Sequence, residues 1–325
     1  MSARAWLLFA AMSAVWGIPY LFIKIAVDHG LDPLLVAWGR MALGAIVLLP
    51  IAWHAGALDG LGRKWRWIVA FAFAEIAVPF PLISYGEVHV SSSLAAILIA
   101  ALPLVVAALT LWIEPEERVS APRLVGLICG LAGVVVLMGI DVVGNGDELL
   151  GAGCVLAATI GYAIGPMIIR HRLAELDPRG VSGAALAAGA IMLAPSLALL
   201  PDAHPTAGAL ASVAVLGVVC SALAFVLFFA LIVEAGPTRA SVITYVNPAI
   251  AVLLGVIVLD EHLGAASLAG LALILAGSWI ATRGGKAEPE AEMAGAGFEP
   301  AKAVPTRLQR VPFDRSGTPP GSSGV

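Results

Sequence analysis

The sequence predicts an all-α membrane protein with ten transmembrane helices, arranged as two inverted five-helix repeats with both termini cytoplasmic. The 325 residues are 60% hydrophobic and only 12% charged, whereas a soluble chain carries about a quarter charged residues. The motif Leu31-Asp32-Pro33 recurs as Leu176-Asp177-Pro178, and Pro103 recurs as Pro248 at the same offset. Such duplication of a long apolar unit is typical of transporter folds.

Apolar stretches separated by Pro, Gly and Asp set the expected helices. About 20 apolar residues cross a bilayer, and turn-forming residues end each stretch. The expected spans are 5–27, 33–53, 66–86, 90–112, 122–140, 149–169, 180–199, 209–232, 238–258 and 264–282. The first span is longer than a signal-peptide core and another span follows, so we expect it to be retained.

The basic residues predict the orientation of these spans. If the N-terminus is cytoplasmic, every Lys and Arg outside the spans falls in a cytoplasmic segment. The charged residues of the outer loops are then all acidic, and these loops also carry His but no Lys or Arg. This distribution follows the positive-inside rule. Because each repeat holds an odd number of helices, the second repeat, 149–283, enters the membrane in the opposite sense to the first, 5–140.

Composition also limits the function. Residues 284–325 are rich in Glu, Pro, Gly and Ser, so we expect a disordered tail without function. A net charge of −4 does not favour nucleic acid as a partner. The histidines lie at span ends or in loops without a paired spacing, and the cysteines lie in apolar stretches. We therefore expect no enzyme, no metal and no cofactor.

Several motifs occur in order along both halves. In the first half they are Trp16-Gly17, Phe22-Ile23-Lys24-Ile25-Ala26, Trp38-Gly39-Arg40, Ser92-Ser93-Leu94-Ala95-Ala96 and Leu102-Pro103. In the second half they are Asn247-Pro248 and Asp260-Glu261. Over about 6–283 the chain thereby resembles the drug/metabolite transporter superfamily, specifically its ten-helix EamA-type exporters.

The resemblance implies secondary active transport of small metabolites, often export of amino acids or related compounds, in the inner membrane. Its partners would be a small-molecule substrate and the lipid bilayer. Alternating access around a site at the repeat interface suits duplicated transporters. Uptake or exchange of a metabolite without proton coupling is the alternative within the same fold. The glycines Gly126, Gly130 and Gly133 on one helix face suit close helix contact or a homodimer surface.

Three charged residues lie well inside the predicted spans, all in the first half: Lys24, Arg40 and Glu75. A charge inside a bilayer costs about 2.5–3.5 kcal/mol on insertion scales. Lys24 is near enough to a span end to reach the headgroups. Arg40 and Glu75 have similar depths and are expected to pair. The pair either fixes two helices together, or Arg40 binds a substrate carboxylate while Glu75 takes the coupling proton.

Backbone breaks and aromatic residues mark the same depth. Prolines are expected to interrupt spans at 16–19, 79–81, 161–166 and 247–248, and together they favour a central cavity, although each alone fits a packing kink. The residues expected to bind substrate there are Trp16, Tyr20, Trp38, Arg40, Tyr85, Tyr162, Tyr245 and Asn247. Simple packing is the alternative for each aromatic ring. Asp260 and Glu261 are expected as solvated charges at helix ends.

Overall fold

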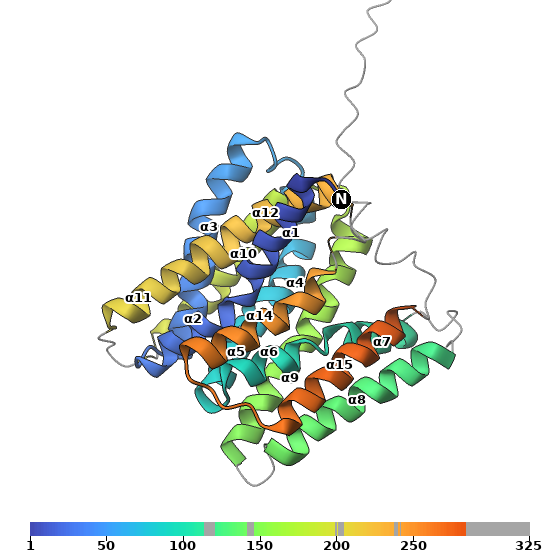
Figure 1. Cartoon of the computed structure of the whole chain (residues 1–325). Coiled ribbons are helices and arrows are strands. Elements are labelled where there is room, and N and C mark those ends of the chain that lie inside the picture. The colour runs from blue at the N-terminus through green and yellow to red at the C-terminus, as the bar shows by residue number, and fades with distance from the viewer. Residues whose placement is uncertain are drawn as a thin grey trace, which may run out of the picture.

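The computed structural model describes residues 1–113, 121–141, 146–198, 200, 205–236, 240 and 242–283. These residues form a bundle of helices and contain no strand (Figure 1). The predicted tail, 284–325, lies outside the described residues.

The elements of the first half follow the predicted spans. They are α1 (Ala3–Gly17), α2 (Pro19–Asp28), α3 (Pro33–His54), η1 (Leu61–Lys64), α4 (Trp65–Ala72), η2 (Phe73–Ala77), α5 (Pro79–His89), α6 (Ser92–Ile99), α7 (Leu102–Ile113) and α8 (Ala121–Asp141). The element η1 is a 3₁₀-helix, whereas η2 is a π-helix.

The second half has a matching series. It consists of α9 (Gly146–Ile168), η3 (Ile169–Leu173), α10 (Pro178–Leu197), α11 (Ala207–Ala214), η4 (Val215–Leu223), α12 (Ala224–Ala235), α14 (Ile243–Val258) and α15 (Ala265–Arg283). Both η3 and η4 are π-helices.

Most of these helices suit a membrane. Within the described ranges, seven helical stretches are long and apolar enough to cross one: Ala3–Asp28, Pro33–His54, Leu61–His89, Ser92–Thr110, Gly146–Leu173, Pro178–Leu197 and Ala207–Ala235. Shorter apolar helices are Ala121–Leu137, Ile243–Val258 and Ala265–Ala281.

The repeated Leu-Asp-Pro motif starts a helix in each half. Asp32 Oδ1 accepts a hydrogen bond from the backbone N–H of Leu34 at 2.8 Å, and Asp177 Oδ1 accepts one from that of Arg179 at 2.9 Å. In both cases the following proline occupies the first helical turn, where its missing N–H costs nothing. The two helices, α3 and α10, then pack against each other. The duplication in the sequence therefore brings its two copies into contact.

Two of the four predicted breaks are confirmed. The first span divides at Ile18 between α1 and α2, and the third changes to a π-helix before Pro79 starts α5. The other two predictions are wrong, because α9 continues through Pro166 and α14 through Pro248. Pro166 lies next to the π-helix η3, and Pro248 lies near the start of α14. Each proline removes one main-chain hydrogen bond, and both helices continue past that missing bond.

A further division was not expected. The predicted span 90–112 consists of two helices, α6 and α7, which separate at Ala100 and Ala101. Pro103 is the second residue of α7, where proline is well tolerated.

Helices α8 and α15 form the tightest contact, which we call the glycine seam: Gly126, Gly130 and Gly133 on α8 with Gly270 and Gly277 on α15. The two helices lie side by side along one edge of the bundle (Figure 1). A Cβ added to Gly126 would meet the backbone of Gly277 and Ala281, and one on Gly133 would come within 2.9 Å of the Gly270 carbonyl oxygen. Small residues let two backbones approach this closely. This face is covered by α15 and is not a dimer surface.

Candidate functional site

Arg40 is a buried cation that connects the two halves. Arg40 is only 9% exposed. The Nε–H donates to Ser221 Oγ on η4 at 3.0 Å, and the guanidinium carbon lies 4.0 Å from the centroid of the Phe80 ring on α5. The hydroxyl of Ser221 in turn donates to the Leu216 carbonyl, five residues earlier, across the π-helical turn. Among the residues that the structure describes, Arg40 therefore has a neutral hydroxyl and an aromatic face as partners, and no anion within salt-bridge distance.

The expected ion pair between Arg40 and Glu75 is not formed. Glu75 lies on the π-helix η2, and its Oε2 is buried without a hydrogen-bond partner. The carboxyl fills the space that Gly165 leaves on α9, where a Cβ would collide with it. The missing side chain of Gly165 therefore explains why the acid lies against α9 while Arg40 contacts η4 and α5.

Two tyrosines, Tyr20 and Tyr162, lie within electrostatic range of these charged groups. Tyr162 on α9 lies within electrostatic range of both Arg40 and Glu75. Tyr20 on α2 lies within range of Tyr162, of Arg40 and of Glu87 on α5. We call the set that these groups form with Lys24 the ionic cluster; its members are Tyr20, Lys24, Arg40, Glu75, Glu87 and Tyr162.

Three predicted aromatic residues lie elsewhere. Trp16 packs its ring 4.8 Å from that of Phe228. The indole N–H of Trp38 donates to the Ala190 carbonyl of α10 at 3.1 Å. Tyr85 is 40% exposed on α5, with its ring 5.0 Å from that of His89. Trp16 and Trp38 thus have packing partners, and Tyr85 lies outside the ionic cluster.

The predicted residues of α14 lie near α1. When the Asn247 amide is oriented to satisfy its neighbours, its nitrogen donates to the Ile243 carbonyl at 2.9 Å and to that of Ser13 at 3.2 Å. Tyr245 is half-buried on the same helix. Asn247 therefore joins α14 to α1.

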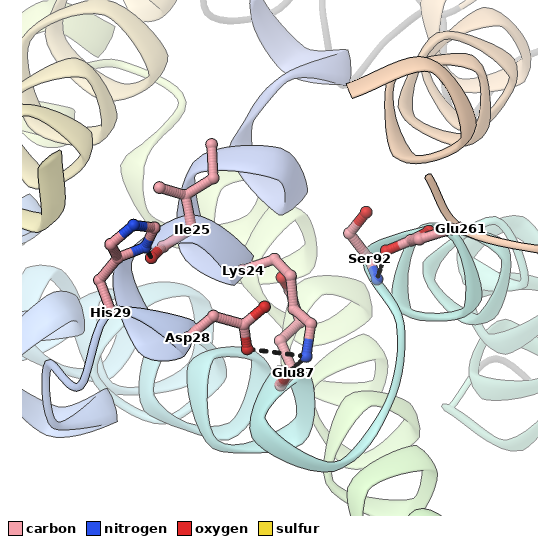
Figure 2. Close-up of polar contacts among 7 residues, drawn as sticks. All are labelled: Lys24, Ile25, Asp28, His29, Glu87, Ser92 and Glu261. Carbon is pink, nitrogen blue, oxygen red and sulfur yellow. Dashed lines mark hydrogen bonds and ion pairs between the residues drawn. The ribbon is translucent and has the colours of Figure 1, made fainter. Parts of the chain in front are cut away.

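Sequence reasoning missed Glu87. This residue is 0% exposed, and neither carboxylate oxygen has a hydrogen-bond partner. The Lys24 ammonium donates to the main-chain carbonyl of Glu87 at 2.9 Å and pairs with Asp28 at 3.1 Å (Figure 2). Lys24 therefore contacts protein groups instead of only reaching for the headgroups. The predicted span ended at residue 86, one position before Glu87, although α5 continues to His89.

Glu261 is the second residue that sequence reasoning misjudged. It was expected as a solvated charge. Instead, its Oε1 accepts from the backbone N–H of Ser92 at 2.7 Å (Figure 2). Its Oε2 accepts from the backbone N–H of Ser93 at 3.0 Å. The first N–H groups of a helix lack partners and attract anions. The loop before α15 thus supplies the carboxylate that caps α6.

A groove of about 440 Å³ lies between α5 and α9, away from these contacts. It is lined by Leu82, Gly146, Leu149, Leu150, Gly153, Cys154 and Ala157. It offers no charged side chain to hold an ionic ligand. Among the described residues, no group of three or more His, Cys, Asp or Glu could hold a metal ion.

Comparisons with known proteins agree with this helical fold. The sequence model of the EamA-like transporter family matches the chain twice, at residues 4–139 and 149–283. A crystal structure with 21% sequence identity superposes with a TM-score of 0.61, covering 87% of this chain and 98% of its own, which supports the fold.

Relatives with similar sequences carry transporter names. An uncharacterized transporter of Archaeoglobus fulgidus is 26% identical, over 86% of this chain and 99% of its own length. The uncharacterized inner membrane transporter YedA of Escherichia coli is 28% identical, over 75% of this chain and 79% of its own. Since the family model covers most of the chain in two copies, this multi-pass membrane protein belongs to the EamA-like transporter family.

Proposed function

We propose that this transporter exports small metabolites, such as amino acids or related compounds, across the inner membrane by proton-coupled alternating access. Its moving parts are two inverted five-helix repeats, 5–140 and 149–283, with both termini cytoplasmic. The two family matches, the apolar helices and the name of the Escherichia coli relative support this proposal. The distribution of basic residues supports the orientation.

The bonding of Arg40 carries the proposal. A guanidinium has five N–H donors in a planar fork, and in Arg40 only Nε–H is hydrogen-bonded to a described residue. A substrate carboxylate could accept two parallel bonds from the remaining donors. A buried cation without an anion is costly, so substrate binding would supply the missing charge.

Glu75 supplies the coupling in this proposal. Its unpartnered Oε2 and its nearness to Tyr162 mean that one acid shares an electrostatic environment with Arg40 without neutralising it directly. While substrate occupies Arg40, Glu75 is neutral and carries a proton. After the substrate leaves, ionised Glu75 balances the Arg40 charge. Proton and substrate would therefore be carried together, so an accumulated substrate leaves the cell with a proton when its own outward gradient exceeds the inward proton gradient.

The test uses purified protein in sealed vesicles with labelled amino acids and related metabolites, with and without an imposed pH gradient. We expect Glu75→Gln to lose gradient-driven flux and to retain exchange of the same substrate across the membrane. The matched control is Glu175→Gln, which removes an exposed surface pair with Lys64 and should behave as wild type. Gradient-independent flux in both wild type and Glu75→Gln would instead identify a facilitator or exchanger.

A further inference from the structure

The residues around Glu87 form a short path from the surface into the bundle. Side-chain exposure falls from 50% at Asp28 to 18% at Lys24, and Glu87 is 0% exposed. The Lys24 ammonium is at hydrogen-bond distance from the Glu87 main-chain carbonyl, yet its ion pair is with Asp28 (Figure 2). The main chain of Glu87 thus lies beside a cation that is paired with another acid, and the Glu87 carboxyl lies within electrostatic range of that cation.

An ionised Glu87 would be unstable in this arrangement. A buried charge without a partner costs several kcal/mol, and neither oxygen of Glu87 receives a hydrogen bond. The charged groups that act on it are Lys24 and Asp28 on α2, Arg40 on α3, and Glu261 before α15. The cations among them are engaged elsewhere, Lys24 with Asp28 and Arg40 with Ser221. The geometry therefore favours the neutral acid.

We propose that Glu87 is a second proton-binding residue of this transporter, and that Lys24 is its exchangeable counter-ion. In the conformation described, Glu87 carries a proton and Lys24 pairs with Asp28. When the O–H bond of Glu87 breaks, the proton passes to water near the half-exposed Asp28. The carboxylate then takes the Lys24 ammonium from Asp28, and Lys24 keeps its charge throughout.

Two tyrosines lie within electrostatic range of the acids of the ionic cluster. Tyr20 lies within electrostatic range of Glu87 and Tyr162, and Tyr162 lies within range of Glu75. Of these two acids, Glu87 is the one within electrostatic range of the half-exposed Asp28. This role in coupling rests on the proposed function, whereas the protonation of Glu87 can be measured without any substrate.

The first experiment is infrared spectroscopy of the full-length protein in lipid nanodiscs during a pH titration. A protonated carboxyl group gives a carbonyl stretch separate from the carboxylate bands. We expect part of this signal to be absent from Glu87→Gln and present in Asp28→Asn. Glu87→Asp, which keeps an acid at this position, controls for a change of fold. Equal carboxyl signals in wild type and Glu87→Gln at every pH would overturn the proposal.

Two further variants test the counter-ion. Lys24→Met removes the cation that stabilises ionised Glu87, so the Glu87 signal should persist to higher pH. Asp28→Asn frees Lys24 for Glu87, so the signal should disappear at lower pH. Shifts in opposite directions support the exchange of Lys24 between the two acids, and an unchanged titration in both variants overturns it. Since no substrate is present, either result stands even if the transport assay finds no flux.

Discussion

The ionic cluster and the glycine seam are opposite solutions to helix packing in one molecule. In the seam, the backbones of α8 and α15 touch, and glycines leave no space for a side chain. In the cluster, Arg40 has no anionic partner among the described residues, and two acids have oxygens without hydrogen-bond partners. Two π-helices, η2 and η4, supply Glu75 and the Ser221 hydroxyl that binds Arg40, and such segments are frequent at functional sites. The seam is built for stability, whereas the cluster retains unused bonding capacity for a ligand and a proton.

Replacement of Arg40 should separate protein stability from transport activity most strongly. Arg40→Met removes a buried charge whose insertion costs about 2.5–3.5 kcal/mol, so thermal stability in detergent should be retained or raised. Loss of a buried charge-assisted contact of about 3 kcal/mol should lower substrate flux roughly 100-fold. Flux and thermal unfolding are measured on the same preparation. A variant that is unstable but fully active per folded molecule would contradict the comparison.

A substitution in the glycine seam should instead lower stability and leave the flux per folded molecule unchanged. Gly126→Ala forces a Cβ against the backbone of α15 and should destabilise the protein by about 1–3 kcal/mol, with normal flux per folded molecule. Gly153→Ala on α9 is the matched control, because a Cβ there meets nothing within 4 Å. In the control, the higher helix propensity of alanine should be neutral or stabilising. Equal thermal stability of the two variants would show that the seam tolerates expansion.

A substitution of Glu261 tests the contribution of a helix cap to stability, for which we expect an intermediate effect. Glu261→Gln leaves a single acceptor oxygen for two backbone N–H groups and removes the charge, which should cost about 1–2 kcal/mol in thermal stability. The neighbouring Asp260→Asn provides the control, since Asp260 is exposed and has φ of 53°, a conformation that asparagine accepts. If both amide variants melt together, the capping contact contributes nothing to stability.

Trp38 should give the smallest effect. Trp38→Phe loses the hydrogen bond to the Ala190 carbonyl, at a cost of about 0.5–1.5 kcal/mol. Because the indole N–H is already engaged, flux should stay close to that of wild type. Trp16→Phe keeps an aromatic ring beside Phe228 and serves as the reference. A large rise in KM for Trp38→Phe alone would assign Trp38 to the substrate site.

Local patterns in the sequence predicted local structure well. The Asp-Pro pairs at 32–33 and 177–178 start helices, and the breaks before Pro19 and Pro79 are where the prolines indicate. The burial of Arg40 also followed from its position within a span.

Contacts between distant segments could not be predicted from such patterns. Nothing near Glu261 indicates that it caps a helix beginning at Ser92, and nothing near Arg40 indicates Ser221. The π-helices likewise arise from tertiary packing, so the direction of the Glu75 carboxyl could not be read from helical periodicity.

The capping of α6 by Glu261 also has a consequence for biosynthesis. The acid lies 169 residues after Ser92, and Ser221 lies 181 residues after Arg40. When the first repeat leaves the ribosome, the N–H groups at the start of α6 and the Nε–H of Arg40 do not yet have these hydrogen-bond partners. Buried backbone groups need such partners, so the first repeat cannot complete its folding alone. Truncation before residue 261 should therefore yield an incompletely assembled chain, open to membrane quality-control proteases.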